Sequence, residues 1–272
     1  MFTPFAFVKS TSAAPSVSYF LDLYPSASRA YSVRRLSSTY TGFCMKVRRV
    51  SDNQDIDVGF DGENLDTGSI NTFIGSGTGK VITWYDQSGN GQDATATLSS
   101  APIIRSGGTT ETIGTRVAMD GSTCVMGFTV ISNLQRYCSL VVGKRGASGD
   151  RLIGFSSDST PNPLLAHWSD NNFYFQWEDY YVNSSATNTS AAHEVLIGST
   201  TAATTAVIDR NGASISLASP VAFAVGTNCN QIMKYGGQNG TAKYQEVILW
   251  ESEQNSSFAG IQSNINTYYS IY

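Results

Sequence analysis

One turn carries polar side chains that could face a sugar or an ion. The segment Trp84–Gly91 reads Trp-Tyr-Asp-Gln-Ser-Gly-Asn-Gly and directly follows an apolar strand. Asp86, Gln87 and Asn90 offer carboxylate and amide groups, and the glycines allow the positive φ of a tight turn. Oxygen atoms of Asp86, Asn90 and Asp93 could also bind Ca²⁺. Because hydrogen bonds alone stabilise such a turn, we expect neither a metal nor a cofactor.

No other motif indicates catalysis or metal binding. Gly75–Lys80 is rich in glycine, but it lacks the GxxxxGK[ST] spacing of a phosphate-binding loop and precedes a strand. His167 and His193 have no serine or cysteine partner in a recognisable motif, and two histidines are too few for the usual zinc site. The cysteines form no CxxC pair, so we expect buried thiols, with two disulfides as the alternative: Cys44, Cys124, Cys138 and Cys229.

The composition is that of one large all-β domain. The chain has 272 residues, of which only 14% are charged. Short strands joined by polar turns have such a composition. The net charge of -4 argues against a nucleic-acid partner, because nucleic-acid binding needs a cationic face. We find no secretory signal and no apolar run long enough to span a membrane, so we expect synthesis in the cytoplasm and no membrane partner.

A basic stretch is followed by an acidic one, and the members are Arg34, Arg35, Lys46, Arg48 and Arg49, then Asp52, Asp55, Asp57 and Asp61. Neighbouring residues on a strand face opposite sides of a sheet, so the basic residues cannot all join one patch. We expect cross-strand ion pairs between the two groups. A contact surface for an acidic protein is the alternative.

Hydrophobic periodicity places the elements around these residues. Helices are predicted over 64–74, with Asp66 as the N-terminal cap, and over 256–269, with an apolar stripe at i, i+3, i+7 and i+10. Asp209–Gly212 has the Asn-Gly signature of a hairpin turn. Residues 1–18 look like an arm or linker, and residues 19–272 like one β-sandwich domain. Strands are predicted over 31–36, 44–50, 55–60, 81–85, 116–119, 137–143, 152–155, 173–177, 193–197, 206–209 and 244–250.

Most of the chain resembles a group of bacteriophage virion proteins with a concanavalin A-like (LamG/lectin-glucanase) domain. The matching segments include Leu21–Ala27, Ala30–Leu36, Val47–Asn53, Thr83–Gly91 and Asn264–Tyr272. The resemblance implies an all-β fold, a concanavalin A-like jelly-roll β-sandwich with a short C-terminal helix. It also implies a virion component that contacts other virion proteins and forms a homo-oligomer.

The sequence is also similar to the catalytic domain of family 54 α-L-arabinofuranosidases. This similarity implies a retaining mechanism with two carboxylates. The acid/base aspartate of that family lies in a Gly-Gly-Asp-Asn context, and the matching string here is Gly236-Gly237-Gln238-Asn239. The nucleophilic glutamate corresponds to Asp170, which is one methylene shorter. The adjacent cysteine pair that lines the family's sugar site has no counterpart.

An amide cannot protonate a leaving group, so Gln238 predicts a lost activity. We therefore expect no catalytic residues and a structural component of a bacteriophage virion, with head, fibre or tail positions left open. A host-surface glycan-binding module is the alternative, and a retaining glycosidase is a third. The residues that would bind a glycan are Trp168, Asp170, Trp177, Tyr180, Tyr181 and Gln238.

Overall fold

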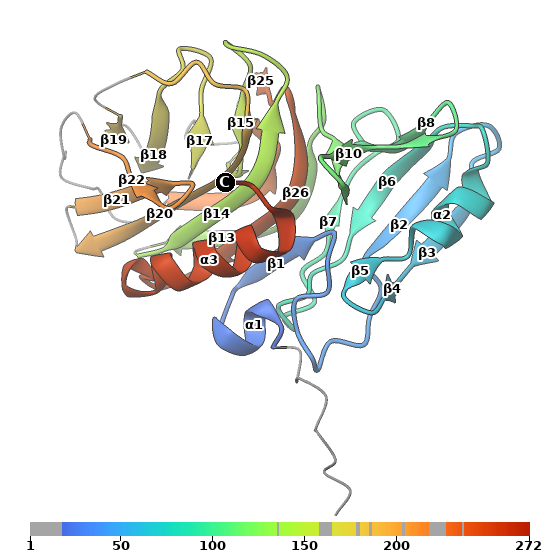
Figure 1. Cartoon of the computed structure of the whole chain (residues 1–272), viewed down its shortest axis with the longest axis horizontal. Coiled ribbons are helices and arrows are strands. Elements are labelled where there is room, and N and C mark those ends of the chain that lie inside the picture. The colour runs from blue at the N-terminus through green and yellow to red at the C-terminus, as the bar shows by residue number, and fades with distance from the viewer. Residues whose placement is uncertain are drawn as a thin grey trace, which may run out of the picture.

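The chain folds into a jelly-roll β-sandwich with a short C-terminal helix, and this confirms the predicted fold class (Figure 1). The computed structural model describes residues 18–134, 136–157, 165–177, 180–184, 187–202, 205–217, 227–235 and 237–272. The predicted arm, residues 1–18, lies outside the described residues except for Ser18. The division into an arm and one domain therefore stays a prediction.

The helices are α1 (Phe20–Leu23), α2 (Thr67–Ile74), the 3₁₀ turn η1 (Asn255–Ser257) and α3 (Phe258–Tyr269). Among the described residues, no helix is both long and apolar enough to cross a membrane. The strands of the first half are β1 (Arg29–Ser32), β2 (Met45–Arg49), β3 (Asp55–Val58), β4 (Phe60–Asp61), β5 (Asn64–Leu65), β6 (Gly79–Trp84), β7 (Ala94–Thr95), β8 (Ile103–Ser106), β9 (Thr109–Thr110), β10 (Thr112–Ile113), β11 (Arg116–Val117) and β12 (Met119–Asp120).

The strands of the second half are β13 (Met126–Leu134), β14 (Cys138–Arg145), β15 (Leu152–Ile153), β16 (Phe155–Ser156), β17 (Ala166–His167), β18 (Phe173–Trp177), β19 (Tyr180–Asn183), β20 (His193–Ala202), β21 (Thr205–Arg210), β22 (Ala213–Ser214), β23 (Thr227–Ile232), β24 (Lys234–Tyr235), β25 (Gln238–Asn239) and β26 (Ala242–Trp250). The main sheet has the order β16-β23-β13-β7-β6-β8-β12-β26-β14-β20-β21-β22, with β1 paired to β26 and β2 to β6. A smaller sheet has the order β15-β17-β18-β19.

Strand β20, which lies between β14 and β21, is covered on both faces. Gly198 lies so close to Phe175 of β18 that a Cβ atom there would be 2.4 Å from the ring. His193 and Ser199, on the alternate face, contact Tyr269 of α3 and the backbone of Gln254. The smaller sheet and the C-terminal helix therefore sandwich this part of the main sheet, which places the loops above β14 and β17 on a rigid base (Figure 1).

Both predicted helices form, α2 with its predicted cap and α3 with most of its predicted apolar stripe buried. The Asp66 carboxylate accepts a hydrogen bond of 3.0 Å from the Ser69 amide, and α2 ends at Gly75 with φ of 60°. The strand β5 occupies residues 64–65, where the prediction began the helix. In α3, Phe258, Ile261 and Ile265 are buried, as the apolar stripe predicts.

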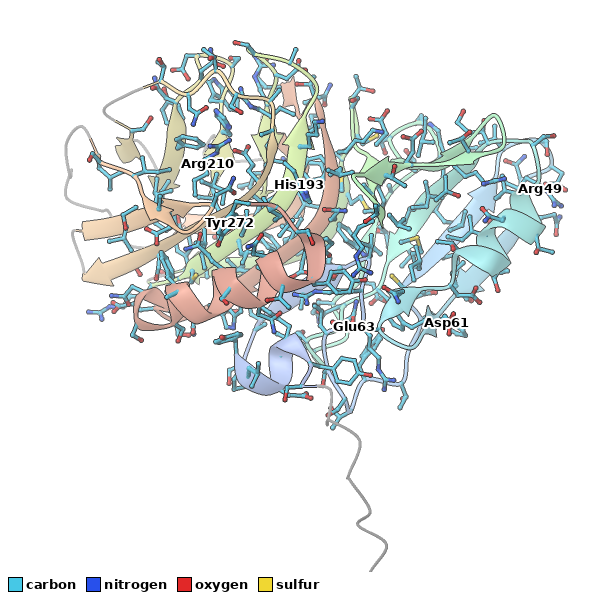
Figure 2. The ribbon with its side chains drawn as sticks, in the orientation of Figure 1. Arg49, Asp61, Glu63, His193, Arg210 and Tyr272 are labelled. Atoms are coloured by element: carbon cyan, nitrogen blue, oxygen red, sulfur yellow. The ribbon has the colours of Figure 1, made fainter. Side chains whose placement is uncertain are left out.

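The expected ion pairs are present across β2 and β3. Arg48 Nε lies 2.6 Å from Asp55 Oδ1, and Lys46 Nζ lies 3.7 Å from Asp57 Oδ1. Arg49, which Figure 2 shows beside α2, pairs with Asp52 at 2.6 Å. These three ion pairs engage Lys46, Arg48 and Arg49 of the basic stretch. All four cysteines lie in the described ranges and are buried free thiols, as expected.

Candidate active site

Four loops meet at the end of β14, near the top of the left half in Figure 1. They are residues 146–151, 168–172, 187–192 and 237–241, and we call them the loop cluster. The Asn188 amide donates to Asn171 O at 2.7 Å, and the Thr241 amide donates to Arg151 O at 2.8 Å. The Gly149 amide donates to Asn171 Oδ1 at 3.2 Å. Segments far apart in sequence are thus joined by hydrogen bonds.

Asp170 is an exposed carboxylate in this cluster. Its Oδ2 accepts from the Tyr174 hydroxyl at 2.6 Å and from Asn172 Nδ2 at 3.1 Å, and its Oδ1 accepts from the Asn172 amide at 3.0 Å. Burial favours the neutral acid, but these hydrogen bonds outweigh it and lower the pKa of Asp170 below the usual value. Asp170 is therefore an ionised group at neutral pH, which suits a nucleophile and not an acid.

Trp168 and Gln238 belong to neighbouring loops of the cluster. The guanidinium of Arg151 lies over the Trp168 ring, 4.9 Å from its centroid. The Arg151 amide also donates to Thr241 Oγ1 at 2.7 Å, which ties this arginine to the loop that carries Gln238. Gln238 is exposed on β25. Arg151 thus links the loop of Trp168 to the loop that carries Gln238, and a shared site of Trp168, Asp170 and Gln238 stays a prediction.

The other three predicted glycan-binding residues are only partly described. Trp177 ends β18, and Tyr180 and Tyr181 begin β19, in the smaller sheet. Backbone pairing sets Trp177 opposite Tyr180 and Gln176 opposite Tyr181. Their side chains lie outside the described part of the chain, so their role in a site stays a prediction.

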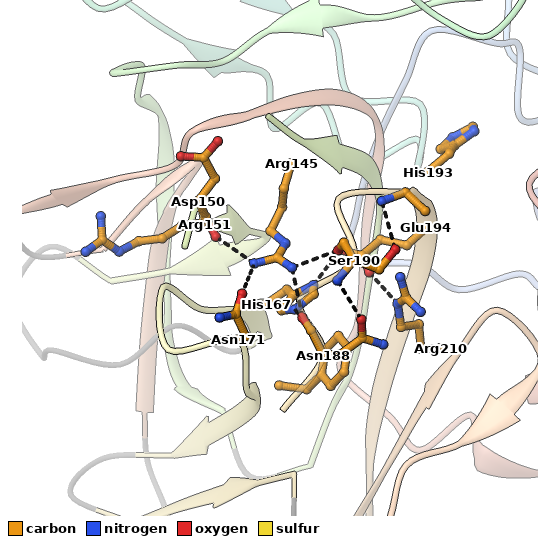
Figure 3. A network of polar contacts seen from close by, with 12 residues as sticks. Arg145, Asp150, Arg151, His167, Asn171, Asn188, Ser190, His193, Glu194 and Arg210 are labelled. Carbon is orange, nitrogen blue, oxygen red and sulfur yellow. Dashed lines mark hydrogen bonds and ion pairs between the residues drawn. The ribbon is translucent and has the colours of Figure 1, made fainter. Parts of the chain in front are cut away.

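Arg145 lies at the centre of the loop cluster, as Figure 3 shows, and sequence reasoning missed it. Its side chain is fully buried at the end of β14. Nη1 donates to Asp150 O at 3.0 Å and to Asn171 Oδ1 at 3.1 Å, and Nη2 donates to Asn188 O at 3.0 Å and to Ser190 O at 2.8 Å. No sequence motif marks this residue, because its partners are up to 45 positions away.

A cluster of three ionisable side chains, His167, Glu194 and Arg210, contacts the loop cluster through Asn188. His167 Nδ1 lies 2.9 Å from Glu194 Oε1, and Arg210 Nε lies 2.5 Å from Glu194 Oε2. His167 Nε2 lies 3.0 Å from Asn188 O (Figure 3). Burial alone would raise the pKa of Glu194, but His167 and Arg210 outweigh it and lower that pKa. This histidine is structural, since both ring nitrogens are engaged.

The turn at Trp84–Gly91, which we call the motif turn, has a structural role away from the loop cluster. Asp86 is buried and accepts from the amides of Ala30, Ser88 and Gln92, at 2.9, 3.0 and 3.1 Å. Gln87 bonds the backbone of Ser32, Arg34 and Leu36, and Asn90 bonds that of Ala27 and Ser28. Backbone and hydroxyl donors occupy the Asp86 carboxylate, so the turn fastens residues 27–36. Gln87 also lines a pocket of about 210 Å³, and a contact of the turn with a sugar stays a prediction.

A pocket of about 310 Å³ opens beside the loop cluster. It shares Gly146 and Thr241 with the cluster, and its polar lining includes Asp120, Lys144 and Lys243. Lys243 Nζ lies 2.7 Å from Glu111 Oε2. Within the described ranges, no group of three or more His, Cys, Asp or Glu side chains that could hold a metal ion occurs.

Comparisons with known proteins point to glycosidases. The family model of the catalytic domain of α-L-arabinofuranosidase B matches residues 22–145, which is less than half of the chain. Similar solved structures are a family 54 α-L-arabinofuranosidase soaked with a cyclic sulfate inhibitor (14% identity, TM-score 0.64) and an arabinofuranosidase complexed with arabinofuranosyl-α-1,2-xylobiose (14%, 0.62). A variant soaked with 4-nitrophenyl α-L-arabinofuranoside is 16% identical, with a TM-score of 0.64. No curated protein matches the chain.

The structural matches cover 89% of this chain but only 63% of each of those enzyme chains. At such low identity they establish a shared fold. The loop cluster lies almost wholly beyond residues 22–145, so the family model does not assign its residues.

These comparisons correct our view of function. We expected a non-catalytic bacteriophage virion protein, and this expectation is wrong. Of the three hypotheses, the comparisons favour the third, a retaining glycosidase. The family model and the three solved structures are those of arabinofuranosidases rather than virion proteins. The error lay in equating the missing proton donor at Gln238 with a missing enzyme, because losing a general acid slows a reaction without abolishing it. A homo-oligomer stays a prediction.

Proposed function

We propose that this chain is a glycosidase domain that hydrolyses α-L-arabinofuranosides, with its reaction site in the loop cluster. The family model over residues 22–145 supports the proposal, as does the shared fold. The observation that carries it is the Asp170 carboxylate, which is exposed, hydrogen-bonded and kept ionised among loops that a fully buried guanidinium ties together.

The first step uses Asp170 as the nucleophile. A carboxylate oxygen attacks the anomeric carbon, the bond to the leaving group breaks, and the leaving oxygen departs with the electron pair. The product is an ester between the sugar and Asp170. Water then attacks the anomeric carbon and loses a proton to the solvent, the ester bond breaks, and the Asp170 carboxylate is restored. Hydrogen bonds from Tyr174 and Asn172 keep that carboxylate oriented.

Gln238 limits which leaving groups this site can expel. Its exposed amide has no proton to give at neutral pH, so alkoxide leaving groups depart slowly. A 4-nitrophenolate leaves without being protonated, so the first step with an aryl glycoside does not need a general acid. We therefore expect aryl arabinofuranosides to react much faster than alkyl ones.

Release of nitrophenolate from 4-nitrophenyl α-L-arabinofuranoside tests the proposal. We expect turnover by the wild-type chain and a loss of roughly 10⁴-fold or more in Asp170→Asn. Asp52→Asn is the matched control, because Asp52 is an exposed aspartate that pairs with Arg49 far from the loop cluster. Equal rates in the Asp170→Asn variant and the wild type, or no release above buffer, would overturn the proposal.

A further inference from the structure

The guanidinium of Arg145 is bonded only to neutral oxygen atoms among the described residues. Three of the four acceptors are backbone carbonyls and the fourth is the side-chain amide of Asn171. The nearest buried carboxylate, Glu194, is already engaged by His167 and Arg210. Burial lowers the pKa of Arg145 from the usual arginine value, although Glu194 acts in the opposite direction.

Burying a charge without a directly bonded counter-charge destabilises the fold, and an apolar side chain would fill the same space at a lower free-energy cost. An arginine offsets this cost where its planar guanidinium donates to several acceptors at fixed angles. The guanidinium of Arg145 donates to acceptors in the loops 146–151, 168–172 and 187–192 at the same time. The arrangement of these loops is thus the feature that needs an arginine.

Asn171 connects Arg145 to the turn that carries Asp170. Its Oδ1 accepts from Arg145 Nη1 at 3.1 Å, from Ser148 Oγ at 3.2 Å and from the Gly149 amide at 3.2 Å. Its backbone has φ of 65°, a left-handed conformation that few residues other than glycine and asparagine adopt readily. The neighbouring residue in the same turn is Asp170, so the contacts of Asn171 set the path of the backbone that carries the nucleophile.

We propose that Arg145 is a positioning residue for Asp170: its guanidinium fixes the 168–172 turn against the 146–151 loop and so places the Asp170 carboxylate for attack. This inference rests on the proposed function. Arg145 itself does not touch Asp170 in the hydrogen bonds described, so it acts through Asn171 and the turn backbone.

Arg145→Lys tests the inference, because lysine keeps the charge but cannot reach all four acceptors with one ammonium group. Arg34→Lys is the matched control, since Arg34 is also buried but bonds Glu246, away from the loop cluster. Two quantities are measured in both variants. They are the hydrogen-exchange rates of the Gly149, Asn171 and Asn188 amides, and kcat and KM for 4-nitrophenyl α-L-arabinofuranoside.

In Arg145→Lys we expect exchange of the three amides to rise roughly tenfold or more and kcat/KM, which reports attack by Asp170, to fall by a similar factor. Arg34→Lys should alter neither the three amides nor kcat/KM. If Arg145→Lys does not fold, Asn171→Gly replaces it. Glycine keeps the positive φ and removes only the Oδ1 acceptor, and we expect the same two changes.

The outcomes separate this inference from the proposed function. An inactive wild-type chain would overturn the proposed function, while the exchange rates would still decide whether Arg145 fixes the turn. An active wild type with unchanged amide exchange in Arg145→Lys would overturn the inference alone. So would faster exchange with an unchanged kcat/KM, because the position of the turn would then not affect attack by Asp170.

Discussion

The Tyr174 hydroxyl lies 2.6 Å from Oδ2 of Asp170, across the turn that connects β17 to β18. This hydrogen bond stabilises the ionised form of the carboxyl group, and the pKa of Asp170 lies below its usual value despite partial burial. The pair thus prepares a nucleophile before any substrate is present. The exposed position of Asp170 then leaves room for a sugar to approach.

Replacing Tyr174 by phenylalanine should shift the acid limb of the pH profile. Activity requires ionised Asp170, so kcat/KM falls as pH drops through the pKa of that group. Tyr174→Phe removes a hydrogen bond that lowers this pKa, and the acid limb should move to higher pH. Tyr40→Phe, which loses a hydroxyl bond to Phe43 O, is the control and should leave the limb in place. An unmoved limb in Tyr174→Phe would show that this bond does not tune the nucleophile.

Replacing Gln238 by aspartate should restore a proton donor. We expect hydrolysis of methyl α-L-arabinofuranoside to rise by roughly 10²–10⁴-fold in Gln238→Asp, because a general acid contributes a factor of that order. The rate of the first step with the 4-nitrophenyl glycoside should change little. Gln238→Asn serves as the control, since it shortens the side chain without adding an acid. A Gln238→Asp variant no faster than Gln238→Asn on the methyl glycoside would contradict the role given to position 238.

Removing the charge of Glu246 should destabilise the fold. Glu246 is fully buried and accepts from Arg34 Nε at 2.9 Å, from Ser32 Oγ at 2.9 Å and from the Tyr269 hydroxyl at 3.1 Å. Glu246→Gln removes the fully buried counter-charge of Arg34 and leaves the partly exposed Glu63, 3.4 Å away, as a weaker partner. The free energy of unfolding should fall by about 3 kcal/mol, the lower end of the range for breaking a buried pair. Denaturant titration measures it. Asp55→Asn, which breaks an exposed pair, should cost less than about 1 kcal/mol.

The stability of the chain should decline as pH falls from neutral, through His193. Burial lowers the pKa of His193 from 6.5 to about 4. Below pH 6.5 the unfolded chain takes up a proton that the folded chain does not, so the stabilising difference is complete above pH 6.5 and is lost toward pH 4. The loss amounts to about 3 kcal/mol.

His193→Gln provides the comparison, because glutamine does not titrate. Plots of unfolding free energy against pH should be flatter for this variant between pH 6.5 and 4 than for the wild type. Parallel slopes for the two chains would mean that His193 does not carry the effect.

Local patterns predicted the elements well, because their causes are local. The stripe Phe258, Ile261 and Ile265 requires one helix face to be buried, and Asp66 caps α2 through a residue three positions away. Ion pairing across β2 and β3 followed from strand alternation.

The site was harder to predict, because its residues meet only through the fold. Asp170 and Gln238 came from a family resemblance, whereas Arg145 and Asn171 have no local signature and are joined by a contact across 26 positions. The motif turn shows the opposite case. The composition of the turn predicted the hydrogen bonds of Asp86 and Asn90, and the structure shows which backbone groups within residues 27–36 they bond. A role of the turn in sugar binding stays a prediction.

The most direct test of the account is the intact mass of the protein after brief incubation with 4-nitrophenyl α-L-arabinofuranoside. Without an acid/base residue at position 238, breakdown of the sugar ester should be slower than its formation from an activated glycoside. We expect a mass increase of one pentosyl residue, located on Asp170 by peptide mapping and lost in Asp170→Asn. An unmodified protein, or a pentosyl group on any other residue, would contradict it.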